Sequence, residues 1–400
     1  MTRDLDLVLF GATGYTGKLT ADYLTQAAGR ESLRWAIAGR NRDKLAAVRD
    51  ELGDGGKSVE LVVADAGDPA ALAAMAKRAR VVCSTTGPYA KYGSAVVAAC
   101  ADAGTHYCDL TGEVAWMRQM IDAHHARARD TGARIVHTCG FDSIPSDLGC
   151  YLAQRAYIAT YGRPAATVTG QFRFKGGFSG GTVASMVNMA EEMRRDPSLR
   201  KLIGNPYALD PDPSVKRDHT PRDVRAPKRD QRTGRYLTTF VMASCNTRVV
   251  RRSHALAGFP WGDGFRYDEV MTTSNPVVAA GVNVALGGFV LALATPVLRD
   301  VVVGQLPQPG TGPSPAQRTS GFWRAELVAT GPMGELVYEA GDHFDPGYGS
   351  TARMLGEAAL CLAKDKLTSP GGVQTPSIAM GDALAERLRS AGLTFAPAVA

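Results

Sequence analysis

The sequence predicts an α/β protein with a Rossmann-type, doubly wound parallel sheet, followed by a second α+β domain built on a mostly antiparallel sheet. Three observations predict this fold. A short apolar run near the N-terminus enters a glycine-rich turn, strands and helices then alternate up to about residue 150, and alternation at period two follows. We expect the Rossmann domain over 1–147, the second domain over 148–345, and C-terminal helices over 346–400 that return to the first domain.

The apolar run at 5–10 leads into a turn with a glycine at every third position. Gly11 permits the turn, Gly14 lets backbone N–H groups approach a pyrophosphate, and Gly17 allows the next helix, expected over 18–28, to pack close to the strand. The pyrophosphate would lie at the positive end of that helix. The residues predicted to bind a dinucleotide are Gly11, Thr13, Gly14, Tyr15, Thr16, Gly17, Arg40, Asp65, Thr86, Gly87 and Pro88.

The second strand, at 35–38, indicates which dinucleotide would bind. An NAD site usually has Asp or Glu after this strand to bind the ribose 2′-hydroxyl, whereas this chain has Arg40. A guanidinium can bind a phosphate through two parallel hydrogen bonds, so we favour NADP over NAD. The alternative is that Arg40 and Arg42 begin an ordinary solvated helix. Asp65 ends a third strand at 59–64, where it could approach the adenine.

The remaining elements of the first domain follow from caps and apolar runs. Asp68 and Pro69 read as an N-cap and a first helical residue. Further strands are expected at 81–84, 105–109 and 133–138, and helices at 94–103 and 113–130. In the second domain we expect strands at 171–175, 236–243, 247–252 and 265–272, a hairpin of 323–328 with 335–340, and then helices at 350–364 and 377–390.

Two segments stand out by composition. Residues 196–235 are rich in proline and basic side chains, which indicates a surface loop or, alternatively, a docking site or lid. Residues 271–298 contain no charged side chain. Prolines, glycines and two asparagines interrupt this apolar run, so we interpret it as a buried helix or as an apolar wall that contacts a hydrophobic substrate. Peripheral membrane contact stays open as an alternative.

Polar residues gather where the strands of the first domain end. Tyr89 lies close to Lys91, and a nearby cation lowers the pKa of a phenol, so Tyr89 is a candidate proton donor. The alternative is that its ring packs against the nicotinamide or its ribose. Asp109 and Glu113 could act as acid or base, or could cap the helix that follows.

A third cluster lies at 140–147. Asp142 and Ser143 fall where the nicotinamide end of a cofactor should lie, and Ser146 or Asp147 is the expected N-cap of the next helix. The candidate catalytic residues are therefore Tyr89, Asp142 and Asp109. The glycine-rich stretch at 175–182 could hold an anionic tail through backbone N–H groups or could be a flexible connector.

Bulk composition narrows the partners. The formal net charge of +6 suits an anionic ligand but is no nucleic-acid signature, so we expect no nucleic acid. Seven scattered cysteines without a C-x-x-C pair indicate reduced thiols and a cytoplasmic location. We expect no signal peptide, and the histidine and cysteine spacings predict no metal site.

Several stretches together resemble one family. They are 10–17, 38–40, 86–89, 107–113, 140–147, 174–182 and 372–376. On these motifs the chain is similar to the saccharopine dehydrogenase-like oxidoreductases, and within them to the mycobacterial trans-acting enoyl reductases of phthiocerol-type lipid synthesis. The resemblance implies a Rossmann domain, a substrate domain that could also serve oligomerisation, and NADPH-dependent reduction of an enoyl thioester held by a polyketide synthase carrier domain.

Two rival functions remain open from the sequence. A saccharopine-type amino-acid oxidoreductase would need arginines for its substrate carboxylates, and the evident supply is Arg173, Arg248, Arg251 and Arg252. The other rival is a non-catalytic nucleotide-binding protein at a lipid surface. Whether the chain forms homo-oligomers also stays open.

Overall fold

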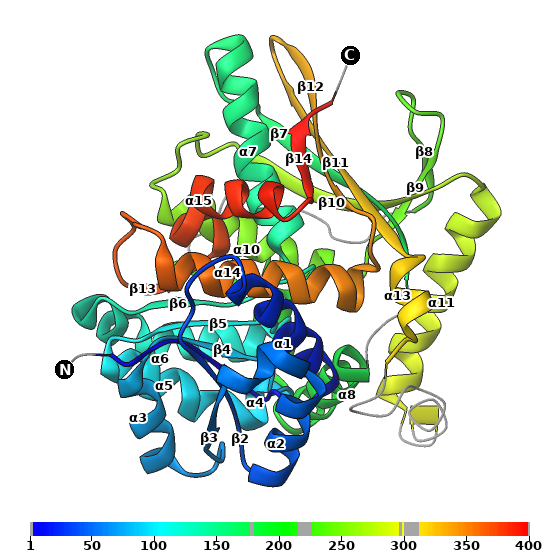
Figure 1. Cartoon of the computed structure of the whole chain (residues 1–400). Helices are drawn as coiled ribbons and strands as arrows, with labels where there is room; N and C mark the ends of the chain where they lie inside the picture. The colour runs from blue at the N-terminus through cyan, green and yellow to red at the C-terminus, as the bar shows by residue number, and fades with distance from the viewer. Residues whose placement is uncertain (1–2, 177–179, 215–225, 296–297, 300–311, 399–400) are drawn as a thin grey trace.

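The computed structural model describes residues 3–176, 180–214, 226–295, 298–299 and 312–398, and these form two seven-stranded sheets (Figure 1). Sheet A has the order β13-β6-β5-β4-β1-β2-β3 and every pair in it is parallel. Its strands and the helices between them are β1 (Leu5–Phe10), α1 (Tyr15–Ala28), β2 (Trp35–Gly39), α2 (Arg42–Glu51), β3 (Glu60–Val63), α3 (Pro69–Arg78), β4 (Ala79–Ser84), α4 (Tyr89–Tyr92), α5 (Ser94–Ala103), β5 (His106–Asp109), α6 (Val114–Thr131), β6 (Arg134–Val136) and, from the C-terminal region, β13 (Gly372–Gln374).

Sheet A owes its parallel order to strands that are apolar on both faces. All six residues of β1 are buried, because helices cover both sides of the sheet. The central strands β1 and β4 pair in register from Leu5 with Ala79 to Phe10 with Ser84. The predicted doubly wound sheet is therefore confirmed, with β13 as an added edge strand.

Sheet B has the order β14-β12-β11-β7-β10-β9-β8 and is antiparallel except for the pair of β7 and β10. Its elements are α7 (Ile144–Tyr161), β7 (Thr167–Lys175), α8 (Gly180–Arg195), α9 (Ser198–Gly204), β8 (Lys228–Arg229), β9 (Tyr236–Thr239), α10 (Ala243–Leu256), β10 (Arg266–Thr273), α11 (Pro276–Ala294), α13 (Pro315–Thr319), β11 (Phe322–Gly331), β12 (Gly334–Asp342) and β14 (Thr394–Pro397). The hairpin of β11 and β12 is as predicted.

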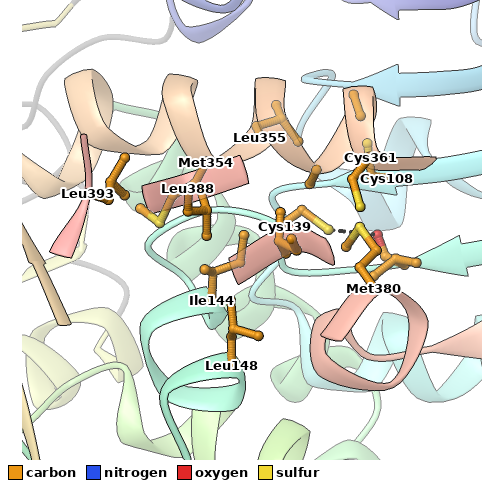
Figure 2. Packing of buried hydrophobic residues seen from close by; sticks show 14 of the residues in the cluster. Cys108, Cys139, Ile144, Leu148, Met354, Leu355, Cys361, Met380, Leu388 and Leu393 are labelled. Atoms are coloured by element: carbon orange, nitrogen blue, oxygen red, sulfur yellow. Dashed lines mark hydrogen bonds between the residues drawn. The ribbon is translucent and has the colours of Figure 1, made fainter. Parts of the chain in front are cut away.

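Helices fill the space between the two sheets (Figure 1). Helix α14 (Thr351–Lys364) packs on β1, β4 and β5 of sheet A, α7 packs on β7, β11 and β12 of sheet B, and α15 (Pro376–Ser390) contacts both helices. Figure 2 shows the apolar core at this junction, where Ile144 and Leu148 of α7 lie near Met354, Met380 and Leu388. The domain boundaries at 147 and 345 stay predictions.

The strand predicted at 247–252 is wrong, because these residues belong to helix α10. The prediction relied on alternation at period two, which separates a buried face from an exposed one. Here Thr247 to His254 are buried on every side, since α10 lies against α7, β10 and α15. The period-two alternation of apolar residues at 247–252 therefore did not distinguish a strand from a helix.

The prediction that 271–298 forms a buried helix is also wrong. A helix does form, as α11, with Asn275 as its N-cap. Only 12% of its 18-residue apolar window is buried, and Val277 and Val284 are 76% and 75% exposed. In the described part of the chain, α11 is the one helix long and apolar enough to cross a membrane, by length and composition only.

The basic segment 196–235 is only partly a loop. It contains α9 and the short strand β8, and residues 215–225 lie outside the described residues.

Candidate functional site

The glycine turn after β1 is built by close backbone contacts. Gly11 has φ +90°, and a Cβ there would lie 2.3 Å from the Thr86 hydroxyl. A Cβ on Gly17 would lie 2.3 Å from the Gly11 carbonyl oxygen, so α1 could not pack as it does with any larger residue. A Cβ on Gly14 would lie 3.4 Å from the Gly11 carbonyl oxygen, which is an ordinary contact distance. The roles predicted for Gly11 in the turn and for Gly17 in helix packing are therefore confirmed, and the pyrophosphate contact predicted for Gly14 stays a prediction.

The turn presents hydrogen-bond donors suited to a phosphate. The first-turn N–H groups of a helix have no partner inside the helix, and among the described residues no acidic side chain and no capping side chain occupies this end of α1. The buried Thr86 hydroxyl likewise has no hydrogen-bond partner among the described residues. These unsatisfied donors fit the pyrophosphate of a dinucleotide.

Arg40 lies between β2 and α2 and is not part of either element. Helix α2 begins at Arg42, and Asn41 caps it by accepting a hydrogen bond from the Lys44 N–H at 2.9 Å. The Arg40 side chain is exposed and makes no hydrogen bond or ion pair with any described residue. Asp65 is also exposed, and its Oδ1 accepts a hydrogen bond from the Gly67 N–H at 2.7 Å.

The other predicted cofactor residues surround this turn. Tyr15 directs its hydroxyl to the Pro313 carbonyl and accepts a hydrogen bond from Arg318 at 2.6 Å, so its side chain holds the 312–318 segment beside the turn. Thr13 and Thr16 are half-buried in the turn and the first helical turn of α1. Gly87 is exposed, and Pro88 is the N-cap residue of α4.

Tyr89 is buried at the carboxyl end of β4. Its hydroxyl donates a hydrogen bond to the Ser84 carbonyl at 3.1 Å and accepts one from the Leu110 N–H at 3.1 Å, and its ring stacks on Trp116. Burial, together with the nearby Asp109, raises the pKa of Tyr89 well above its ordinary value. This is opposite to the shift that Lys91 was expected to cause, because Lys91 is exposed and the phenol is not.

Asp109 joins the ends of β5 and β6. Its buried carboxylate accepts hydrogen bonds from the Thr111 N–H at 3.1 Å, the Thr138 N–H at 3.2 Å and the His137 imidazole at 2.7 Å. Thr138 has φ +63°, a conformation rare for a β-branched residue and stabilised here by this contact. Asp109 thus fixes the loop that leads to Asp142.

Sequence reasoning missed His137. It lies at the end of β6, at the same sheet edge as Asp109, and that position was the available signal. Its buried Nε2 has no partner among the described residues. The ring also lines a small cavity with Gln374 and Arg252, with room for about one water molecule.

The Glu113 side chain caps helix α4 rather than α6, the helix that follows it in the sequence. Its carboxylate accepts hydrogen bonds from the N–H groups of Tyr89 and Ala90, both at 2.9 Å, at the start of α4, and also from the Ser185 hydroxyl of α8 at 2.8 Å. Burial raises the pKa of Glu113.

Asp142 is the partly exposed carboxyl at this edge. Burial and the neighbouring charge of Asp109 raise its pKa to about 7. The N-cap of α7 is Ser143, rather than Ser146 or Asp147 as predicted. Asp147 is instead buried, where it accepts hydrogen bonds from the Ser253 hydroxyl and from the Ser377 N–H.

Comparison with known proteins shows which family this arrangement belongs to. Residues 7–136 match the saccharopine dehydrogenase NADP binding domain. A Mycobacterium tuberculosis protein is 45% identical over 98% of this chain and 97% of its own length. Trans-acting enoyl reductases of Mycobacterium ulcerans and Mycobacterium bovis are 41% and 40% identical, each over 98% of this chain and 97% of the relative. The chain belongs to the trans-acting enoyl reductase family.

A solved structure shares the fold of this chain. Saccharopine dehydrogenase of Saccharomyces cerevisiae superposes with a TM-score of 0.55 over 98% of this chain and 99% of that chain. At 11% identity this likeness shows the fold alone. As a member of the family with an NADP-binding domain, the chain is an NADP-dependent oxidoreductase.

Three of the four arginines that a saccharopine-type site could use have a structural role in this family member, and the fourth, Arg173, is half-buried on β7. Arg248, Arg251 and Arg252 are buried on α10. They donate hydrogen bonds to backbone carbonyls, among them those of Ile203, Pro206, Tyr267, Leu209 and Val373. These hydrogen bonds hold α10 against the neighbouring segments that supply the carbonyl groups.

Among the described residues, no three or more His, Cys, Asp or Glu side chains lie close enough together to hold a metal ion.

Proposed function

We propose that this oxidoreductase reduces the carbon–carbon double bond of an enoyl thioester. The observation that carries the proposal is Asp142, a partly exposed carboxyl whose pKa is raised to about 7, at the sheet edge beyond the phosphate-binding turn. A carboxyl that keeps its proton near neutral pH can serve as a general acid. The names of the relatives, trans-acting enoyl reductases, support this substrate class.

Asp142, Asp109 and Tyr89 would have different roles in this reduction. Hydride transfer to the β-carbon of the substrate is the chemistry that NADPH would supply when bound at the turn between β1 and α1. The α-carbon must then gain a proton, and the Asp142 carboxyl holds one at that edge. Asp109 would act as a positioning residue, because its carboxylate is fully engaged in fixing the loop before Asp142. Tyr89 would hold the ends of β4 and β5 together, since both hydrogen-bonding positions of its hydroxyl face backbone groups.

The proposed partner is an acidic carrier domain of a polyketide synthase, which would present the enoyl group as a thioester. The net charge of +6 supports electrostatic attraction to such a domain. The glycine-rich stretch at 175–182, which would hold the anionic tail of the substrate, lies partly outside the described residues, because 177–179 are not described. A cytoplasmic location is part of the proposal, supported by seven cysteines that are all buried free thiols.

The test is turnover with a labelled cofactor. Purified protein is incubated with NADPH deuterated at the transferred position and with a CoA or carrier-bound enoyl thioester, and the product is analysed by mass spectrometry. We expect loss of the absorbance of NADPH and one deuterium at the β-carbon. Binding of NADPH without turnover on any enoyl thioester would contradict the proposal and favour the non-catalytic alternative.

A further inference from the structure

The outward face of α11 is apolar along its whole length. Val277, Val284 and Leu291 are strongly exposed and follow one another at intervals of seven residues, so they form a stripe along one face of the helix. Small residues flank this stripe, and no charged residue occurs between 271 and 298. Large exposed apolar surfaces of this kind mark interaction sites.

The inward face of α11 is fixed to sheet B. Thr238 of β9 donates its hydroxyl hydrogen to α11, where the Ala279 carbonyl is 2.9 Å and the Asn283 amide oxygen 2.7 Å away. The same Asn283 oxygen accepts a hydrogen bond from the Thr239 N–H at 3.3 Å. Crossing a membrane would break these bonds and expose Asn283 to hydrocarbon, so the helix is built to lie on a surface rather than to span one.

One basic side chain of β8 lies on the α11 side of sheet B. Arg229 pairs with Tyr236, which shares the face of β9 that Thr238 presents to α11, whereas Lys228 pairs with Leu237 and points to the opposite face. Strand β8 is the edge of sheet B and pairs with β9, on which α11 packs, and Figure 1 shows β8, β9 and α11 on the same side of the molecule. Lys228 and Arg229 of β8 are exposed. Arg232 in the following turn forms an ion pair with Glu326, so it adds little net charge.

We propose that α11 docks this protein on a lipid surface that contains anionic lipids. The outward stripe would enter the acyl-chain boundary, and Arg229 would face the headgroups. The exposed Arg229 beside the apolar face favours an anionic lipid surface over a second copy of the chain. The inference is independent of the enoyl reductase proposal.

Vesicle flotation tests the docking directly. The full chain is mixed with vesicles of phosphatidylcholine alone or of phosphatidylcholine with phosphatidylglycerol. We expect the wild type to float with the anionic vesicles, and the double variant Val284→Asp, Leu291→Asp to lose most of the floating fraction. The variant Arg229→Glu should lose the preference for anionic lipid. Met333→Asp, an exposed apolar residue in the β11–β12 turn, is the matched control and should float like wild type.

A fluorescent label reports the depth of each position. Because the seven native cysteines are buried, a cysteine introduced by Val284→Cys can be labelled selectively with an environment-sensitive dye. We expect a blue shift of the dye at 284 on anionic vesicles and none at 333 after Met333→Cys. NADPH binding and thermal melting of every variant report folding, because these side chains lie outside the cofactor turn.

Two outcomes would overturn the proposal. One is equal recovery of wild type and the Val284→Asp, Leu291→Asp variant in the vesicle fraction. The other is absence of flotation together with a concentration-dependent dimer in light scattering that the same variant converts to monomer, which would assign α11 to a second copy of the chain.

Discussion

Arg40 is the residue on which cofactor choice depends. It is exposed, lies outside α2, and makes no ion pair with any described residue, so its guanidinium is available to a ligand. Its position after β2 is the position where NAD enzymes carry an acidic residue for the ribose hydroxyl. A guanidinium at this position favours a 2′-phosphate and a carboxylate repels it.

We expect Arg40→Asp to weaken NADPH binding by about one to two orders of magnitude, because a hydrogen bond to a charged group contributes about 1.5–3 kcal/mol. NADH binding should change little or improve. Titration of protein fluorescence with both cofactors measures this. Arg42→Asp is the matched control, since Arg42 is the first residue of α2, and an equal loss in both variants would mean that general charge rather than Arg40 attracts the phosphate.

Asp142→Asn tests the proposed proton donor. The amide cannot supply a proton, so we expect kcat to fall by about a hundredfold or more while the dissociation constant of NADPH stays unchanged. In the wild type, kcat should fall as pH rises through about 7, because the carboxyl then loses its proton. That limb of the pH profile should be absent from the residual activity of the variant.

Tyr89→Phe separates the second candidate donor from the first. The variant loses the hydrogen bonds to the Ser84 carbonyl and the Leu110 N–H, so we expect a lower melting temperature with most of kcat retained. If Tyr89→Phe abolishes turnover of a folded protein and Asp142→Asn does not, the two roles must be exchanged.

The residue positions were more predictable than the residue roles. Tyr89, Asp109 and Asp142 do lie at one sheet edge, because parallel strands end together and the sequence marks where each strand ends. The predicted direction of the pKa shift of Tyr89 was wrong, because proximity to Lys91 in the sequence does not show whether the phenol is buried. The contact of Asp109 with His137 joins residues from two strands, and no local pattern encodes such a pair.

At the scale of elements, the turn between β1 and α1 gives a matched pair of variants. In Gly17→Ala the new methyl would lie 2.3 Å from the Gly11 carbonyl oxygen, so we expect destabilisation of about 1–3 kcal/mol and loss of NADPH binding. In Gly14→Ala the new methyl would lie 3.4 Å from the Gly11 carbonyl oxygen, so the protein should fold normally. We expect it to bind NADPH more weakly, because the methyl would occupy space that the pyrophosphate would fill. Chemical denaturation and cofactor titration measure the two effects, and equal destabilisation of both variants would contradict this account.

The elements that the sequence mispredicted share one cause. Helix α10 looked like a strand because alternation requires one exposed face, and α10 has none. Helix α11 was predicted to be buried because apolar side chains are usually removed from water. Hydrophobicity alone does not show whether protein or lipid would remove them. Strands β1 to β4 were predictable because each is a short, mostly apolar run followed by turn or cap residues.

At the scale of the whole molecule, the C-terminal region ties the two sheets together. Strand β13 joins sheet A, β14 joins sheet B, and α15 runs between them. Buried acidic groups lie along this junction. Asp147 of α7 contacts α10 and α15, and Glu269 of β10 accepts hydrogen bonds from Tyr267 at 2.8 Å and from Asn246 at 3.0 Å, with Asn246 in turn contacting Ser143 beside Asp142.

These buried acids predict how stability depends on pH. Burial raises the pKa of Asp147 to about 6 and that of Glu269 to about 7, above the values of the unfolded chain. Between about pH 4 and 7 the folded state therefore holds protons that the unfolded state releases, so their contribution to the free energy of unfolding decreases as pH rises through that window. The contribution is complete below the unfolded pKa and lost above the folded one.

Glu269→Gln removes one of these groups while keeping the shape of the side chain. Because a pKa unit corresponds to about 1.4 kcal/mol, we expect the variant to lose about 2.5 kcal/mol less than wild type in free energy of unfolding between pH 5 and pH 8. Urea unfolding at both pH values measures the difference, and Glu326→Gln, on strand β11 of the same sheet, serves as a half-exposed control that should keep the wild-type dependence. An unchanged pH dependence in Glu269→Gln would mean that Glu269 is ionised in the folded protein, and the polar chain from Tyr267 to Ser143 would then have to stabilise a buried charge.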